Sequence, residues 1–194
     1  MLSYEESLKI LKETDALLEG HFILSSGLRS PKYLQCAQLL SKPYKANKIC
    51  VSLSQKIKKE FPEIDLILSP AMGGIIIGYE MGKLLNKETI FAERVGGKFK
   101  LRRNFKIKSG SKVLIMEDVI TTGKSSNECS LLVDNFKAEL IGYACIIDRS
   151  NKKSILKKKI ISQIEIHIPT YEKENLPANL IAIDPVKPGS RNIK

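Results

Sequence analysis

The 194-residue chain lacks the features that mark several common classes of protein. No apolar run approaches the ~20 residues that a membrane-spanning helix needs, and the acidic stretch Met1–Glu6 does not resemble a signal peptide. The four cysteines are scattered without a Cys-x-x-Cys pair, and only two histidines accompany them. We therefore expect a cytoplasmic protein with no membrane contact, with free buried thiols and without a zinc site.

Aromatic residues are also scarce, at 6%, although the net charge is +11. This charge fits three explanations: nucleic-acid binding, an anionic small substrate, or lysine enrichment along the whole chain. The basic residues cluster only over 98–108 and 152–159, and aromatic residues do not alternate with them as a base-stacking surface requires. We therefore do not expect nucleic acid as a partner.

The hydrophobic pattern predicts alternating helices and strands in a single domain over residues 1–194. Helical spacing is present over 3–18, 43–61, 75–85 and after Gly123, and Ser3 with Glu6 can form a capping box. Short apolar runs predict strands over 64–68, 89–92, 113–116, 140–147, 164–168 and near residue 180. Such alternation is typical of an α/β fold with a mostly parallel sheet.

Polar loops follow several of these predicted strands. Ligands of parallel sheets bind beyond the carboxyl ends of the strands. We therefore expect three loops, Ser69–Gly74, Glu117–Ser125 and Asp148–Arg149, to meet at one edge. The basic segment Glu93–Lys108 follows another strand, and it is either a solvent-exposed loop or a mobile lid that meets a polyanion. Gly20–Tyr33 has the composition of a hairpin or loop.

The segment Val113–Ser125 is the most informative stretch. An apolar run leads into the acidic pair Glu117 and Asp118, and a turn rich in hydroxyl groups follows. It is not a P-loop, because Asp118 stands where that pattern needs its first glycine. Carboxylates accept hydrogen bonds from sugar hydroxyls, whereas a turn at a helix N-terminus binds phosphate. The segment therefore predicts a ligand that carries both a sugar ring and a phosphate.

Val113–Ser125 resembles the phosphoribosyl pyrophosphate signature of the type I phosphoribosyltransferases. Further segments resemble the orotate phosphoribosyltransferases within that family. These segments are Gly20–Tyr33, Ser69–Gly74, Ala92–Arg103, Asp148–Arg149 and Lys187–Arg191, so the resemblance covers nearly the whole chain. It implies the type I fold, a central mostly parallel sheet flanked by helices, with a core of about 43–170. A small N-terminal hood, about 1–40, would combine with the C-terminal tail.

The resemblance also implies an activity. The phosphoribosyl group would pass from phosphoribosyl pyrophosphate to orotate, giving orotidine 5'-monophosphate and pyrophosphate in the synthesis of UMP. Orotate would displace pyrophosphate with inversion through an oxocarbenium-like transition state, without a protein nucleophile. The resemblance further implies a homodimer and Mg²⁺ held mainly by the phosphoribosyl pyrophosphate, with no dedicated protein ligands.

Site residues carry over position by position. The residues implied to bind phosphoribosyl pyrophosphate are Glu117, Asp118, Val119, Ile120, Thr121, Thr122, Gly123, Lys124, Ser125, Gly73 and Gly74. Those implied to act in catalysis are Asp118 and the lid residues Arg94, Lys98, Lys100, Arg102 and Arg103. Those implied to bind orotate are Thr121, Arg149, Ser25 and Tyr33.

The chain departs from some members of the family at three places. Ser25 and Gly73 stand where those members have lysine, and the lid carries Leu101-Arg102-Arg103 in place of a Lys/His-rich sequence. The division of work among the basic lid residues therefore stays open. Two other functions also stay open: a phosphoribosyltransferase that acts on purines, and a regulator that binds nucleic acid and senses phosphoribosyl pyrophosphate.

Overall fold

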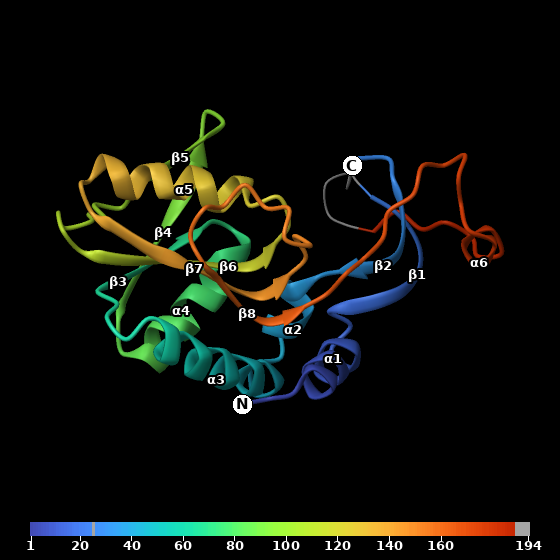
Figure 1. Ribbon diagram of the computed structural model, residues 1–194, viewed down its shortest axis with the longest axis horizontal. Helices are drawn as coiled ribbons and strands as arrows, with labels where there is room; N and C mark the ends of the chain where they lie inside the picture. The colour runs from blue at the N-terminus through green and yellow to red at the C-terminus, as the bar shows by residue number, and fades with distance from the viewer. Residues whose placement is uncertain (25, 189–194) are drawn as a thin grey trace.

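A six-stranded sheet with helices on both faces forms the centre of the computed structural model, which describes residues 1–24 and 26–188 (Figure 1). The strand order is β5-β4-β3-β6-β7-β8, and all neighbours are parallel except β4 and β5. The strands are β3 (Leu66–Pro70), β4 (Glu88–Val95), β5 (Lys98–Leu101), β6 (Lys112–Ile120), β7 (Glu139–Asp148) and β8 (Ile160–Glu165). The mostly parallel α/β sheet predicted from the sequence is confirmed.

The helices divide between the two faces of this sheet. One face carries α5 (Lys124–Asn135), and the other carries α3 (Pro43–Glu60) and α4 (Gly73–Leu85). The short α2 (Cys36–Leu40) and the N-terminal α1 (Tyr4–Glu13) extend the second layer. In the described part of the chain, no helix is both long and apolar enough to cross a membrane.

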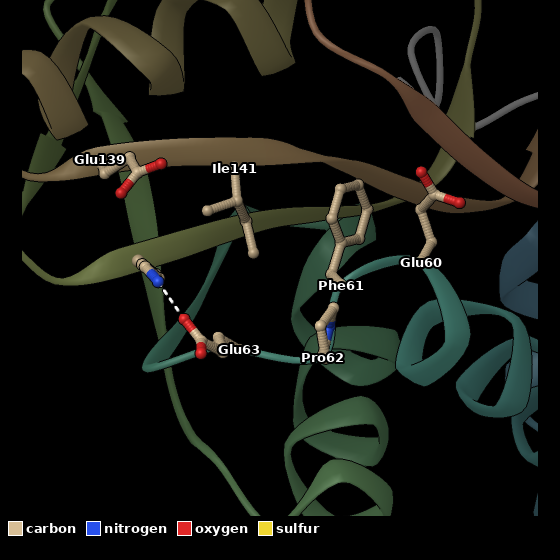
Figure 2. A pocket seen from close by; sticks show the side chains of 7 residues that line it. Glu60, Phe61, Pro62, Glu63, Glu139 and Ile141 are labelled. Carbon is tan, nitrogen blue, oxygen red and sulfur yellow. Dashed lines mark hydrogen bonds and ion pairs between the residues drawn. The ribbon is translucent and has the colours of Figure 1, made fainter.

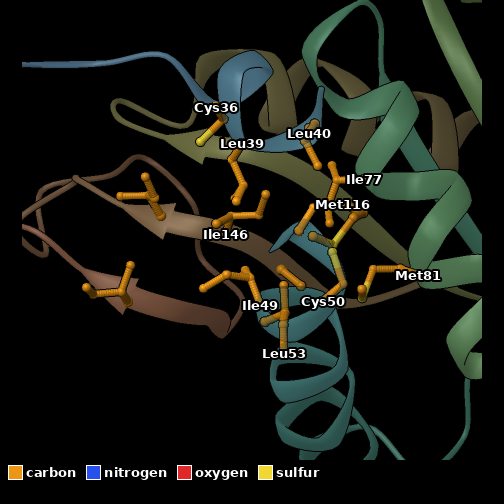
Figure 3. Packing of buried hydrophobic residues seen from close by; sticks show 14 of the residues in the cluster. Cys36, Leu39, Leu40, Ile49, Cys50, Leu53, Ile77, Met81, Met116 and Ile146 are labelled. Atoms are coloured by element: carbon orange, nitrogen blue, oxygen red, sulfur yellow. The ribbon is translucent and has the colours of Figure 1, made fainter. Parts of the chain in front are cut away.

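Strand β6 is central because alternate side chains enter two different apolar clusters. Leu114 and Met116 pack with α3 and α4, whereas Val113 and Ile115 pack toward α5. Figure 3 shows Met116 among the side chains of the first cluster. This alternation follows from the two-residue period of a strand that is covered on both faces. Burial of these four side chains fixes the register of β6, and therefore the face of the sheet on which each later residue of the strand lies.

The first predicted helix is confirmed in type but ends early. Its capping box between Ser3 and Glu6 is present. The helix ends at Glu13 rather than at residue 18, because the backbone turns at Asp15, which has a φ of 59°. Leu17 then starts β1 (Leu17–Ile23) and is buried as a strand residue.

The hairpin predicted over Gly20–Tyr33 is present as β1 and β2 (Arg29–Leu34), which pair antiparallel. Segments from the other end of the chain continue it. The N–H group of Arg29 donates to the carbonyl of Tyr171 at 2.8 Å, and that of Ile23 donates to Val186 at 2.8 Å. We call this unit, residues 17–34 with 171 and 186, the hood.

The predicted strand near residue 180 is wrong. The chain forms the short α6 (Ala178–Ile181) instead, in which Leu180 is buried while Ile181 is 68% exposed. Only Leu180 is anchored in the core, which suits one helical turn. A strand would bury every second residue of the segment instead. Ser25 and the last three residues of Lys187–Arg191 lie outside the described residues.

Helix α4 is mostly apolar in sequence, yet it is buried on one side only. Ile77 and Met81 are fully buried against the sheet. Ile76 and Tyr79 lie on the opposite side and are 55% and 66% exposed, and Met72 at the start of the helix is 83% exposed. The helix therefore presents an apolar strip, Met72, Ile76 and Tyr79, on the surface.

Candidate functional site

The acidic pair lies within β6 rather than beyond its end. Pairing with β7 continues to Ile120 and Asp148, so Glu117 and Asp118 belong to the strand. The loop after β3 reaches the same place. A Cβ atom at Gly73, the first residue of α4, would lie 2.8 Å from Oδ1 of Asp118, so only glycine fits without displacing the carboxylate. The predicted meeting of these two segments is therefore present.

Arg149 lies beside the turn that follows β6. Its backbone N–H group donates to the carbonyl of Ile120 at 2.8 Å, which brings Arg149 next to Thr121. The side chain is half-buried, and this burial lowers the pKa of the guanidinium. Arginine keeps its charge in proteins, so the site contains a partly desolvated cation. Such a group binds a planar carboxylate strongly.

The turn Thr121–Gly123 leads directly into α5 and has an open outer side. Thr121 and Thr122 are exposed, and the N–H group of Lys124 donates to Oγ1 of Thr122 at 3.3 Å. Gly123 has a φ of 78°, and a Cβ atom there would lie 2.6 Å from Cγ of Leu156. The two hydroxyls and the α5 N–H groups that follow Lys124 are thus available to an anion.

The two carboxylates of the acidic pair are poorly solvated. Burial raises the pKa of Glu117 to about 7, although a hydrogen bond from the Ser126 hydroxyl opposes the shift. Burial also raises the pKa of Asp118, against the hydrogen bond that Oδ1 accepts from the Val119 N–H group at 2.9 Å. Among the described residues no cation forms an ion pair with either carboxylate. The pair is therefore suited to accept hydrogen bonds from a ligand.

Val119 and Ile120 contribute to the site through their backbone. The Ile120 side chain is 1% exposed and packs in the cluster under α5, and Val119 packs against the cluster on the other face. The side chains of these two predicted binding residues are thus turned into the core.

The basic segment Glu93–Lys108 begins as a β-hairpin. β4 and β5 pair antiparallel around a turn at Gly96 and Gly97, and Phe99 is buried. Arg94 is held in place: its guanidinium lies 4.2 Å from the ring centroid of Phe99, and Nη1 lies 2.8 Å from Oε2 of Glu128 on α5.

The other lid cations differ in their partners. Arg102 and Arg103 lie 4.0 Å and 3.1 Å from Oε1 of Glu93. Lys98 and Lys100 are exposed, and no ion pair forms at either within the described residues. Both lysines are therefore free to meet an incoming anion.

The hood approaches the acidic pair from the side of α2. Tyr33 packs on Phe22, with ring centroids 5.7 Å apart. The chain then enters α2, where the Cys36 thiol lies 3.9 Å from the carbonyl of Asp118. Tyr33 thus belongs to a segment that ends at the site, whereas Ser25 lies outside the described residues.

Two residues of the site were not predicted from the sequence, Ser126 and Glu128. Both lie on α5, where Ser126 bonds Glu117 and Glu128 pairs with Arg94. The helical spacing after Gly123 was visible, but the partners are 9 and 34 residues away along the chain. A local pattern contains no signal for such contacts.

A shallow hollow lies at the opposite edge of the sheet, near the amino ends of β6 and β7 (Figure 2). It is lined by Glu60, Phe61, Pro62, Glu63, Lys112, Glu139 and Ile141. Lys112 pairs with Glu63 across its rim. None of the predicted site residues lines this hollow, so it is separate from the site described above.

Comparison with known proteins agrees with this geometry. The phosphoribosyl transferase domain family matches residues 40–175. An orotate phosphoribosyltransferase of Methylorubrum extorquens is 46% identical over 188 residues, which is 96% of each chain. One of Caldicellulosiruptor saccharolyticus is 45% identical over 193 residues, with both chains covered completely.

Solved structures share the fold. The crystal structure of orotate phosphoribosyltransferase from Aeropyrum pernix has a TM-score of 0.72 and 21% identity over 81% of this chain and 92% of its own. A crystal structure of adenine phosphoribosyltransferase has a TM-score of 0.69 and 20% identity over 83% and 99%. With the full-length relatives at 45–46% identity, the chain belongs to the phosphoribosyl transferase family, in its orotate phosphoribosyltransferase branch.

Proposed function

We propose that this protein transfers the 5-phosphoribosyl group from phosphoribosyl pyrophosphate to orotate in the synthesis of UMP. The observation that carries the proposal is the juxtaposition of Arg149 with the Thr121 turn and with the acidic pair that precedes it. A sugar phosphate and a carboxylated base would thus lie side by side. The near full-length relatives are named for this activity.

The two halves of phosphoribosyl pyrophosphate would occupy different parts of the site. Glu117 and Asp118 would accept hydrogen bonds from the 2- and 3-hydroxyls of the ribose. The turn Thr121–Ser125 would hold the 5-phosphate at the N-terminus of α5. Gly73 and Gly74 would bring backbone N–H groups close to the pyrophosphate.

Orotate would bind between the turn and the hood. Its planar carboxylate matches the guanidinium fork of Arg149, and Thr121 would contact the base. Tyr33 and Ser25 would cover it from the hood. Closure of the lid would bring Lys98 and Lys100 to the pyrophosphate and exclude water, which otherwise hydrolyses the activated sugar.

Mg²⁺ is part of the proposal. The described residues contain no cluster of three His, Cys, Asp or Glu side chains suited to a metal ion. Mg²⁺ often keeps several waters and binds substrate phosphates, so the pyrophosphate oxygens would hold most of it. The ion would neutralise charge on the leaving group. We also infer a cytoplasmic location, which suits four free and buried cysteines.

The first prediction concerns the reaction itself. We expect loss of orotate absorbance when the protein is mixed with phosphoribosyl pyrophosphate and Mg²⁺, and no turnover of adenine, hypoxanthine or uracil. EDTA in excess should abolish the reaction, because the leaving group then lacks its counter-charge. Turnover of a purine but not of orotate would favour the purine-specific alternative. Salt-sensitive binding of nucleic acid without any turnover would favour the regulator.

The second prediction concerns the base site. Arg149→Ala should raise the KM for orotate about tenfold to a hundredfold, because a charge-assisted hydrogen bond contributes roughly 1.5–3 kcal/mol. The KM for phosphoribosyl pyrophosphate should change less than about threefold. Lys152→Ala, on the exposed loop three residues on, is the control. Normal orotate binding by Arg149→Ala would show that the base lies elsewhere.

The third prediction concerns the ribose site. Asp118→Asn keeps the shape of the side chain but removes its charge, and we expect kcat/KM to fall on the order of a hundredfold. Asp134→Asn on the exposed side of α5 should behave like the wild type. Steady-state kinetics of both variants decide the matter, and wild-type turnover by Asp118→Asn would refute the ribose assignment.

We further propose a homodimer in which the apolar strip of α4 takes part. Met72, Ile76 and Tyr79 are more than half exposed, and a surface strip of this kind marks a contact with another protein.

The fourth prediction tests this assembly. Light scattering should give about twice the 21.7 kDa of the chain for the wild type. Ile76→Asp should shift the mass toward one chain, because a carboxylate would be buried without a partner. Leu131→Asp, at a residue that is 54% exposed on α5, is the control and should stay dimeric. A monomeric wild type would refute the dimer.

A further inference from the structure

Ser126, the third residue of α5, makes an unusual contact for a helical serine. Its side chain is fully buried, and its hydroxyl donates to Oε2 of Glu117 on β6. Serines inside helices commonly bond a carbonyl of the preceding turn, as Ser130 does with Asn127 at 2.7 Å. Ser126 instead links the helix to the strand that bears the acidic pair.

The other groups around Glu117 do not favour its charged form. On its own strand Asp118 adds a second negative charge. Cys145 of β7 is its neighbour in the sheet, and Cys129 of α5 faces it, and both thiols are buried and neutral. Arg94 lies near Cys129 but pairs with Glu128. The Ser126 hydroxyl is therefore the side-chain donor that supports the Glu117 carboxylate within the described residues.

We infer that Ser126 is a positioning residue, which fixes one oxygen of Glu117 so that the other, Oε1, accepts a hydrogen bond from the sugar of the substrate. A carboxylate has several lone pairs, so one oxygen can be held while the second stays available. The identity of the sugar rests on the proposed function. The contact between Ser126 and Glu117 does not.

This arrangement predicts how the site responds to pH. Burial raises the pKa of Glu117 to about 7, and the hydrogen bond from Ser126 acts in the opposite direction. Loss of the hydroxyl would raise the pKa further, because burial would then be opposed less. At neutral pH more of Glu117 would be protonated, and a neutral carboxyl group accepts a hydrogen bond from the sugar more weakly than a carboxylate does. At higher pH both proteins would carry the charged form.

The fifth prediction is a change in the pH profile. In Ser126→Ala the acid limb of kcat/KM for phosphoribosyl pyrophosphate should move to higher pH by about one unit. The KM should rise about five- to tenfold at pH 7 and less than threefold at pH 9. Ser126→Thr keeps a hydroxyl and should restore the wild-type profile. Ser130→Ala, one turn further on the same helix, is the matched control.

A second measurement keeps the inference testable without turnover. Titration of the Glu117 carboxyl carbon by NMR, in the free protein, should give a higher pKa in Ser126→Ala than in the wild type. An equal pKa in the two proteins, or a loss of kcat/KM that is the same at pH 7 and pH 9, would overturn the inference. If the wild type failed to convert orotate, the proposed function would fail, while this titration would still decide the role of Ser126.

Discussion

Two adjacent carboxylates lie on the central strand of the sheet, where burial opposes their ionisation. The surrounding structure is arranged to keep them there. Alternate residues of β6 enter separate apolar clusters. This packing fixes the register of the strand and so the positions of Glu117 and Asp118 in the sheet. Gly73 leaves room for one carboxylate, and Ser126 bonds the other. A site that holds desolvated acceptors in this way needs little rearrangement when a sugar binds.

The lid illustrates a different use of charge. Three of its arginines lie against glutamates of the same chain, Arg94 with Glu128 and the other two with Glu93. The arginine side chains of these pairs are 42–60% exposed, and ion pairs with an exposed partner contribute little to stability. Under the proposed function, the more highly charged pyrophosphate would displace these glutamates at small cost. The ion pairs hold the three arginines in defined positions, but they can be broken at small cost.

Much of the fold could be predicted because the relevant patterns are local. Helical and strand periods are visible over about four to nineteen residues, and turns rich in glycine or hydroxyl groups mark the loops after the strands. The parallel order then brings those loops to one edge, which explains why Gly73, Asp118 and Arg149 were assigned to one site. The errors arose where tertiary contacts decide. The strand β6 continues to Ile120 because β7 pairs with it, and the tail forms a helical turn because Leu180 alone is anchored.

The roles of Ser126 and Glu128 could not be predicted for the same reason. In the sequence alone, each resembles any other polar residue of an amphipathic helix, because its partner lies on another element. The resemblance to a family supplied the residues that are proposed to contact the ligand. It did not supply the residues that hold those in place.

The hood has a consequence for the order in which the molecule is completed. Its hairpin comes from residues 17–34, but isolated β-bridges join it to Tyr171 and Val186, which lie far along the chain. The ribosome must therefore synthesise the chain as far as Tyr171 and Val186 before these backbone bonds can form. The sheet, by contrast, has all its strands once Glu165 has emerged. During synthesis the hood can thus be completed only after all strands of the sheet are available.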